Sequence, residues 1–394
     1  MEKSIHYSET IVNELKGKKI YEKFSECILK HIVTILISIF SVGYKGKTVN
    51  FAIHSGCHRT TIAHFLNRGK WDDDILESAV KQAVINIIYA ESQKTGKPIL
   101  CIIDDTIASK TKPSSHSMHP IESAYFHFSH LKKKQDYGHQ AISVMLSCNG
   151  ITLNYAIMIY DKSVSKIKLV SDIAKELPIA PNISYLLCDS WYTCSSVFDS
   201  FCKIGFYTVG ALKTNRILYP YGKKLSVCQL AEKIEEADAA SLFHIVTVKG
   251  RRYYVFRYEG NLKGTENAVV LLTFPVGALY SSRSLRAFIC TNAALSNEEI
   301  LDFYVQRWKI EVFFRDVKTK LAFDQCQIRS ARGIQRFWRI TSLAFLIACC
   351  TSSSFDFSEG YLILLHKITE EQISFIFHCA ENGISLSSLI ALVT

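Results

Sequence analysis

The chain has 394 residues, a formal net charge of +10, and apolar side chains at 48% of its positions. This apolar content excludes a globally disordered chain, and the length favours two or three domains over one small core. The basic excess favours a polyanionic partner, with nucleic acid before an anionic membrane surface. Thirteen cysteines without a CxxC pair, behind a polar opening segment, favour reduced thiols in a cytoplasm.

Residues 1–92 are predicted to form a helical DNA-binding domain. Inside it, Ala52, Gly56 and Ile62 have the spacing of a helix-turn-helix over residues 49–67. The alternative is a plain helical hairpin that does not read DNA. In the DNA-reading version the second helix, Arg59–Asn67, offers five side chains to DNA: Arg59, Thr60, Thr61, His64 and Asn67.

Two apolar runs, Ile32–Gly43 and Ile340–Cys350, are too short to span a bilayer, so we expect buried helices and no membrane partner. From Lys97 an apolar strand is predicted to end at Asp104 and Asp105. Two further strands are expected on either side of Asn149-Gly150, because this dipeptide is a strong hairpin signal.

A helix is predicted over residues 163–178, followed by a second apolar strand that ends in Asp189. Residues 210–290 have the short runs and glycine punctuation of a β-rich region. Ser296 and Glu299 form a capping box that is predicted to open one long helix, and the chain after about residue 340 is expected to be helical.

The long helix carries an unusual polar strip. At 100° per residue, Tyr304, Arg307, Glu311 and Lys318 share a strip about 60° wide. An ordinary ion-paired surface face would explain it, and so would a face that handles phosphate. Arginine suits the second role because its planar fork matches phosphate oxygens. The apolar residues between them are predicted to lie in the core: Trp308, Ile310, Phe313 and Val317.

Three acids follow the order strand, strand and helix: Asp104, Asp189 and Glu311. A carboxylate at the end of a buried strand is costly unless something satisfies it. Mg²⁺ is a good candidate, because it is bound by one or two carboxylates together with substrate phosphates. Two such ions can activate a water molecule and stabilise the leaving oxygen during phosphodiester cleavage.

These residues resemble the bacterial insertion-sequence transposases of the DDE type, over about residues 95–335. In that family the first acid commonly stands two positions before Thr or Ser, as Asp104 does in "DDT", although Asp105 also precedes that threonine. Asp189 in "LLCDSWY" matches the second acid. The helical signature Y-x2-R-x3-E-x6-K matches at four positions: Tyr304, Arg307, Glu311 and Lys318.

The resemblance implies an α/β fold: an RNase H-like mixed sheet with a β-rich insertion at about 210–290, flanked by an N-terminal helical DNA-binding domain and a C-terminal helical region. The implied catalytic domain covers 93–340 and the C-terminal region 341–394. Asp104, Asp189 and Glu311 would hold two Mg²⁺ or Mn²⁺ ions. Tyr304, Arg307 and Lys318 would bind DNA phosphates. The implied activity is cleavage at element ends and strand transfer into target DNA, in a nucleoid-associated homodimer.

In relatives that form a DNA hairpin, a tryptophan of the insertion stacks on a flipped base. This chain has none there, so a hairpin route is in doubt. Four aromatic residues of the insertion either stack on the base in place of a tryptophan or pack between the strands: Tyr253, Tyr254, Phe256 and Tyr258. The segment from Arg307 to Arg339 holds nine basic and three acidic residues. Three of these arginines, Arg315, Arg329 and Arg332, are DNA-binding candidates, and Arg329–Arg339 is predicted to form one basic face. Lys132–Lys134 is either another phosphate contact or a solvated loop.

Two alternatives to a transposase stay open from the sequence. One is an RNase H-like nuclease or resolvase that cuts DNA without joining it. The other is a non-catalytic DNA-binding protein that descends from a transposase and relies on the helix-turn-helix.

Overall fold

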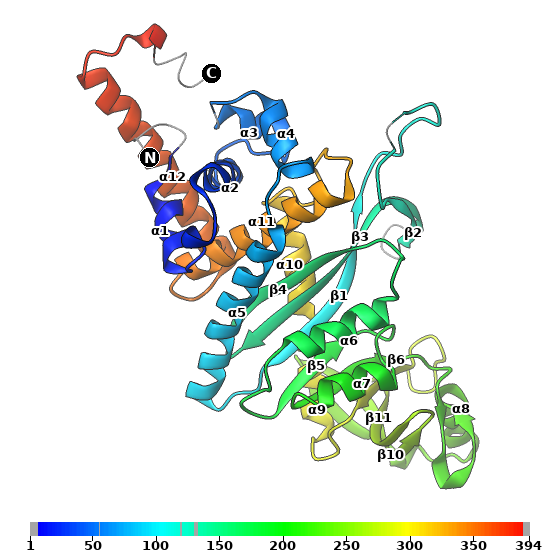
Figure 1. The fold of residues 1–394 in the computed structure, drawn as a ribbon. Helices are drawn as coiled ribbons and strands as arrows, with labels where there is room; N and C mark the ends of the chain where they lie inside the picture. Colours follow the sequence, from blue (N-terminus) through cyan, green and yellow to red (C-terminus); the bar gives the residue numbers. More distant parts are fainter. Residues whose placement is uncertain (1–6, 55, 119, 130–132, 389–394) are drawn as a thin grey trace.

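The computed structural model describes residues 7–54, 56–118, 120–129 and 133–388. The described residues form a mixed α/β structure in which one open, twelve-stranded sheet is flanked by helices from both ends of the chain (Figure 1). The path of neighbouring strands is β2-β3-β1-β5-β6-β12-β11-β10-β7-β8, with β4 added beside β3 and β9 beside β10. The predicted mixed sheet is therefore confirmed.

The first half of the sheet has the RNase H-like order β4-β3-β1-β5-β6. The antiparallel part contains β1 (Leu100–Ser109), β2 (Tyr125–Ser129), β3 (Lys134–Cys148) and β4 (Ile151–Tyr160). The parallel part adds β5 (Ser184–Cys188) and β6 (Phe206–Leu212), joined through the helices α6 (Lys166–Glu176) and α7 (Ser195–Cys202). The hairpin at Asn149-Gly150 is confirmed, because both residues have positive φ between β3 and β4.

One predicted boundary in this sheet is wrong. The strand β1 does not end at Asp104 and Asp105 but continues to Ser109, paired with β3 as far as Gly138. The long β3 supplies partners for the whole ladder, so the polar residues do not stop the pairing. The two aspartates therefore stand in the middle of a strand, and adjacent residues of a strand point to opposite faces of the sheet.

The β-rich insertion continues the same sheet, because β12 pairs antiparallel with β6. Its elements are β7 (Ile217–Leu218), β8 (Leu225–Ser226), α8 (Val227–Glu236), β9 (His244–Val248), β10 (Arg251–Leu262), β11 (Thr265–Pro275) and β12 (Arg286–Cys290). It has a hydrophobic core of its own that includes Leu218, Val270 and Ile289. The aromatic residues of β10 belong to the packing of these strands: Tyr253, Tyr254 and Phe256 are half-buried and Tyr258 is buried.

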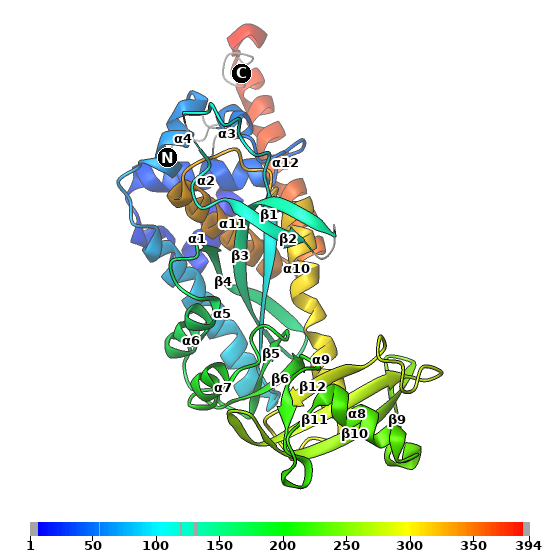
Figure 2. The ribbon, with the colours of Figure 1, turned by 90° about the vertical axis from the view of Figure 1, so that its right-hand side faces the viewer.

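Helices from both chain ends pack together on the other side of the molecule (Figures 1 and 2). The N-terminal helices are α1 (Glu9–Gly17), α2 (Glu26–Ile39), α3 (Thr48–Ile53), α4 (Arg59–Asn67) and α5 (Asp73–Thr95). The C-terminal ones are α11 (Ala331–Thr351) and α12 (Phe357–Glu381). The apolar run Ile340–Cys350 lies in α11, and the other run lies in α2 up to Ile39, after which the chain leaves the helix and Val42 is 80% exposed. In the described part of the chain, no helix has the length and apolarity to cross a bilayer. The predicted division into three domains stays a prediction, and its boundary at residue 340 falls inside α11.

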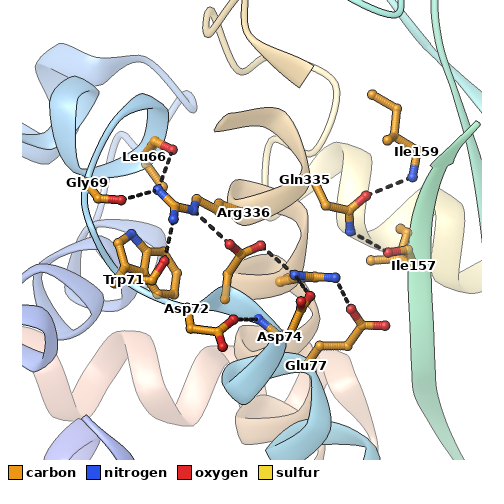
Figure 3. Close-up of polar contacts among 12 residues, drawn as sticks. Leu66, Gly69, Trp71, Asp72, Asp74, Glu77, Ile157, Ile159, Gln335 and Arg336 are labelled. Atoms are coloured by element: carbon orange, nitrogen blue, oxygen red, sulfur yellow. Dashed lines mark hydrogen bonds and ion pairs between the residues drawn. The ribbon is translucent and has the colours of Figure 1, made fainter. Parts of the chain in front are cut away.

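The helix α11 joins the N-terminal helices to the sheet through a buried polar network, drawn in Figure 3. The Arg336 side chain is fully buried and donates to Asp73 at 2.9 Å. It also donates to four carbonyls, those of Phe65, Leu66, Gly69 and Trp71. On the opposite side, Gln335 donates to the Ile157 carbonyl and accepts from the Ile159 N–H of β4, each at 2.8 Å.

Arg339, one turn later on α11, pairs with three acids of α5, namely Asp73, Asp74 and Glu77. We call Arg336, Arg339 and these three acids the α11 joint. The prediction that Arg329–Arg339 forms one basic face for DNA is therefore wrong for Arg336 and Arg339. Both are held against α5 and the segment before it, which pack across this side of α11.

The predicted long helix is confirmed at its capping box but is interrupted. It forms α9 (Asn297–Gln306) and α10 (Trp308–Thr319), with a tighter turn at Arg307, whose N–H bonds to the Tyr304 carbonyl at 3.0 Å. Ile310, Phe313 and Val317 are buried as predicted, but Trp308 is 64% exposed. Trp308 lies about 160° around the helix from the buried Ile310 and therefore on the solvent side. The prediction that it belongs to the core is wrong.

Candidate catalytic site

The polar strip of α9 and α10 lies against the middle of β1. The Arg307 guanidinium donates to the Asp104 carboxylate at 2.5 Å and to the Glu311 carboxylate at 2.9 Å. Burial lowers the pKa of Arg307, but the charges of Asp104 and its other partners outweigh this and leave the pKa raised. The structure thus brings together three predicted residues, two of which are separated by more than 200 positions in the sequence.

The sheet separates the two candidate aspartates. Asp104 pairs with Arg307 at the start of α10, whereas Asp105 pairs with Lys166 of α6. Figure 2 shows α10 and α6 on opposite sides of β1. Asp105 pairs with Lys166 at 2.7 Å and accepts from Gln140 at 2.7 Å and from the Tyr192 hydroxyl at 3.0 Å. These supporting residues were missed by the sequence analysis, because only the three-dimensional pairing of strands shows which carboxylate they satisfy. Asp105 already has three protein partners, whereas Asp104 shares the Arg307 guanidinium with Glu311, and this favours Asp104 as the first acid of the site.

Asp189 follows β5 directly, as predicted, and β5 lies beside β1 in the sheet. Its carboxylate accepts the Trp191 N–H at 2.9 Å. Burial raises the pKa of Asp189, while this backbone hydrogen bond lowers it and the charge of Asp105 raises it further. Burial also raises the pKa of Asp104, to about 7, against the lowering effect of Arg307 and with a raising contribution from Asp189. Asp189 therefore shares its electrostatic environment with both aspartates of β1.

Tyr304 and Lys318 lie on the two sides of this centre. The Arg307 guanidinium lies 5.9 Å from the centre of the Tyr304 ring, which also packs against Phe288 of the insertion. Lys318 donates to the Thr106 hydroxyl at 2.7 Å and to the Ile107 carbonyl at 3.0 Å. Lys318 therefore attaches α10 to β1, and the strip is a half-buried contact rather than a solvated surface face.

The acids of this site have the ligand chemistry of a divalent metal but not its final arrangement. Among the described residues, no three His, Cys, Asp or Glu side chains are grouped so that they could hold a metal ion. Asp104 and Glu311 offer oxygen ligands only, which suits Mg²⁺ or Mn²⁺, and both are already drawn to one cation, the Arg307 guanidinium. The carboxylates therefore fit Mg²⁺ or Mn²⁺ only when the Arg307 guanidinium moves away from them.

A cleft of about 800 Å³ opens next to this centre, between the first half of the sheet and the insertion. Its lining includes Ser190 from the segment after Asp189, Lys213 and Arg286, and Tyr304 of the strip. Two cations and no acid are among its lining residues. Such a concave, basic wall can receive the phosphate backbone of a nucleic acid.

The predicted helix-turn-helix matches two short helices, α3 and α4, and α4 has the predicted bounds of the second helix. Arg59, Thr60, Thr61 and His64 are exposed. Asn67 is not, because its amide donates to the Ala63 carbonyl and its oxygen accepts from Ser330 beside α11. These bonds hold the half-buried Asn67 side chain inside the protein, and contact of the five residues with DNA stays a prediction.

The remaining basic candidates are all at the surface. Arg315 is exposed and pairs with its neighbour Asp316 at 3.3 Å. Arg329 is exposed and donates to the Ser117 hydroxyl at 3.3 Å. Arg332 is exposed on the first turn of α11. Part of Lys132–Lys134 lies outside the described residues; Lys133 and Lys134 are exposed.

Comparison with known proteins identifies the central part of the chain. Residues 95–347 match the family model described as the transposase DDE domain, which covers more than half of the 394 residues. The matched segment contains both strands with the predicted aspartates, the whole insertion and the strip of α9 and α10. A comparison with curated proteins finds no match.

Proposed function

The chain belongs to the transposase DDE domain family, and on that premise we propose that it is the transposase of an insertion sequence. It would cleave DNA at the ends of its own mobile element and transfer the exposed 3′-hydroxyls into target DNA. One observation supports this most directly: the Arg307 guanidinium links Asp104 of β1 to Glu311 of α10, next to Asp189 of the neighbouring strand.

Family membership implies an enzyme that cleaves nucleic acid and a DNA substrate, and the family generally uses divalent metal ions. In our proposal Asp104, Asp189 and Glu311 are the catalytic acids and would hold two Mg²⁺ or Mn²⁺ ions. When bound, such ions would activate the attacking hydroxyl and stabilise the leaving oxygen. We leave Asp105 out of the proposed set because its carboxylate already has Lys166, Gln140 and Tyr192 as partners.

The protein's own cations would position the DNA. Arg307 is 16% exposed and both of its ion-pair partners are carboxylates, so it can exchange them for phosphate oxygens, which have the same bidentate geometry. Tyr304 forms part of the wall of the basic cleft and can contact the same backbone. Lys318 holds α10 on β1, so it positions Glu311 in addition to any contact with phosphate. Arg315, Arg329, Arg332 and the exposed start of α4, with Arg59, Thr60 and Thr61, would extend the DNA contact outside the site.

Two ends must be brought together before strand transfer, so the proposed reaction requires at least a dimer in the complex with DNA. The proposal of a homodimer rests on this mechanism alone.

The test is strand cleavage of a duplex that carries the sequences flanking the gene, with Mg²⁺ or Mn²⁺. Glu311→Gln removes the charge and keeps the shape, so we expect cleavage to fall roughly 10³-fold while DNA binding persists. The matched control is Glu298→Gln, an exposed residue on α9, which should cleave like the wild type.

The products separate the alternatives. Cuts at defined ends followed by joining to a second DNA support a transposase, whereas cuts without joining would favour a nuclease. Binding without cleavage by wild type and variant alike would reject the catalytic assignment and leave a DNA-binding protein that relies on α3 and α4.

A further inference from the structure

The proposed acids Asp104 and Asp189 stand where the pairing of their two strands ends. The last pair of the parallel β1–β5 ladder is Ile103 with Cys188, and each acid is the next residue along its strand. Beyond this pair β1 continues beside β3, whereas the chain after Asp189 enters a turn that leads to α7. The separation of the two carboxylates therefore depends on contacts outside this ladder.

Asp105 contacts the surroundings of both acids from one position. Its backbone N–H donates to the Asp104 carboxylate at 2.8 Å, and its own carboxylate accepts from the Tyr192 hydroxyl at 3.0 Å. Tyr192 lies three residues after Asp189, and its backbone N–H donates to the Asp189 carbonyl at 3.2 Å. A short path of hydrogen bonds thus connects Asp104 to Asp189 through the Asp105 carboxylate and the Tyr192 hydroxyl.

The segment that carries Tyr192 is closely packed. The Tyr192 side chain is fully buried, and the next residue, Thr193, is buried as well. The Thr193 carbonyl accepts a hydrogen bond from the Arg216 guanidinium. Its side chain lies against Gly210 of β6, so that a Cβ at position 210 would stand 2.6 Å from the Thr193 methyl carbon. Tyr192 is therefore held in place on the side of Asp189.

The other end of the link, the Asp105 carboxylate, is held by β3 and α6. One oxygen accepts from the Gln140 amide at 2.7 Å, and the other accepts from the Lys166 ammonium at 2.7 Å and from the Tyr192 hydroxyl. The charge of Lys166 compensates a largely buried carboxylate, which would be costly without a cation. All three partners donate in this arrangement, and a carboxylate accepts at both oxygens whereas an amide accepts at only one.

We propose that Asp105 and Tyr192 are positioning residues of the proposed metal site, and that the hydrogen bond between them sets the separation of Asp104 and Asp189 before metal binds. The inference rests on the proposed function and adds two residues to it. Residues behind the ligands of a metal orient those ligands, and their loss typically costs about 10–100-fold in metal affinity or activity. Asp105 thereby acquires a role in the reaction although it holds no metal in the proposed site.

The variant Tyr192→Phe tests the link without changing any charge, because it removes the hydroxyl and keeps the ring. Isothermal titration calorimetry without DNA measures the affinity for Mn²⁺, and cleavage of the duplex with the gene's flanking sequence gives kcat and KM. We expect the Mn²⁺ affinity and kcat each to fall about tenfold. The KM for the duplex should change less than about twofold, because neither positioning residue is among the proposed DNA contacts.

A double-variant comparison shows whether Asp105 and Tyr192 act through one another. Asp105→Asn should weaken Mn²⁺ binding at least as much as Tyr192→Phe does, because it disturbs all three partners of the carboxylate. Once the link is broken by Asp105→Asn, adding Tyr192→Phe should cause no further loss. Losses that multiply would mean that the two residues act separately and would overturn the proposal. Where Asp105→Asn does not fold, Tyr192→Phe and its control decide the question.

The matched control is Tyr89→Phe on α5, which also removes a buried tyrosine hydroxyl, one that donates to the Pro178 carbonyl at 2.7 Å. It should bind Mn²⁺ and cleave DNA like the wild type. Wild-type Mn²⁺ affinity and kcat in Tyr192→Phe would overturn the proposal, and so would equal losses in Tyr192→Phe and Tyr89→Phe. A wild type that neither binds Mn²⁺ nor cleaves the duplex would instead reject the proposed function itself.

Discussion

Two arginine clusters in this protein use the same chemistry and have opposite consequences. In the α11 joint, Arg336 is fully buried and its N–H groups go to Asp73 and four backbone carbonyls. In the candidate site, Arg307 is 16% exposed, and its guanidinium pairs with two carboxylates, Asp104 and Glu311, and lies against the Tyr304 ring. Both arginines connect segments that are far apart in the sequence.

The difference lies in the partners. A backbone carbonyl cannot leave without unfolding its own segment, so Arg336 is locked into a permanent contact. A carboxylate can exchange a guanidinium for another cation, and a guanidinium can exchange a carboxylate for a phosphate. The four carbonyl partners therefore make the Arg336 contact structural. The carboxylate partners of Arg307 leave its contact open to replacement when metal and DNA bind.

The largest effect should come from breaking the joint. Arg336→Ala leaves Asp73 and four buried carbonyls short of a donor, so we expect the free energy of unfolding to fall by about 3–5 kcal/mol. Urea denaturation followed by circular dichroism measures this loss. Arg332→Ala is the control on the same helix, because this exposed side chain should change stability by less than about 0.5 kcal/mol. A loss below about 1 kcal/mol for Arg336→Ala would remove the distinction between the two clusters.

This contrast also marks what the sequence could predict. The apolar strands, the Asn149-Gly150 hairpin and the capping box at Ser296 were predictable because each depends on local residue pattern. The burial of Arg336 was not predictable, because the sequence does not show whether solvent or another helix lies against an arginine. The exposure of Trp308 could have been predicted from its angular position on the helix, but the sequence analysis placed it in the core.

In the candidate site, too, the sequence predicted some features and could not predict others. The resemblance to a known family supplied the acids and the strip from their spacing alone. It could not choose between Asp104 and Asp105, because that choice depends on which face of β1 meets α10. Nor could spacing show that a guanidinium lies between Asp104 and Glu311, since a metal ligand and a salt-bridge partner are the same residue type.

A buried histidine beside the α11 joint should make the free energy of unfolding depend on pH. His139 of β3 is fully buried, and its ring packs edge-on against Trp338 of α11. Its Nε2 donates to the Glu122 carbonyl at 2.9 Å, while its Nδ1 is buried without a hydrogen-bond partner among the described residues. Burial lowers the pKa of His139 from 6.5 to about 4, against the raising effect of the Glu122 bond, and Lys110 and His127 lower it further.

Because the folded pKa lies below the unfolded one, the unfolded chain binds a proton first as the pH falls. Stability from this residue is complete above pH 6.5 and is lost between pH 6.5 and 4. We expect a loss of about 2 kcal/mol at pH 5 relative to pH 7.5. Urea denaturation at both pH values should show this loss in wild type and in the exposed-residue control His378→Gln, and a smaller loss in His139→Phe. Equal losses in all three proteins would contradict the assignment.

The smallest expected effect concerns Arg307 and its two carboxylate partners, Asp104 and Glu311. If the Arg307 guanidinium occupies carboxylates that also hold metal, its removal should tighten metal binding in the absence of DNA. We expect Arg307→Ala to bind Mn²⁺ about tenfold more tightly than the wild type, because two acids lose the cation that neutralises them. Isothermal titration calorimetry measures the affinity without reference to cleavage.

Two controls decide whether the comparison holds. Arg315→Ala removes an exposed arginine from the same helix, one that pairs only with its neighbour Asp316 among the ion pairs of the described residues, and should leave Mn²⁺ affinity unchanged. Asp104→Asn should abolish the gain when combined with Arg307→Ala, which would locate the ion at this site. Weaker Mn²⁺ binding by Arg307→Ala would mean that the guanidinium assembles the acids rather than competing for them. Arg307 would then be a fixed structural contact like Arg336, and the contrast drawn between carbonyl and carboxylate partners would fail.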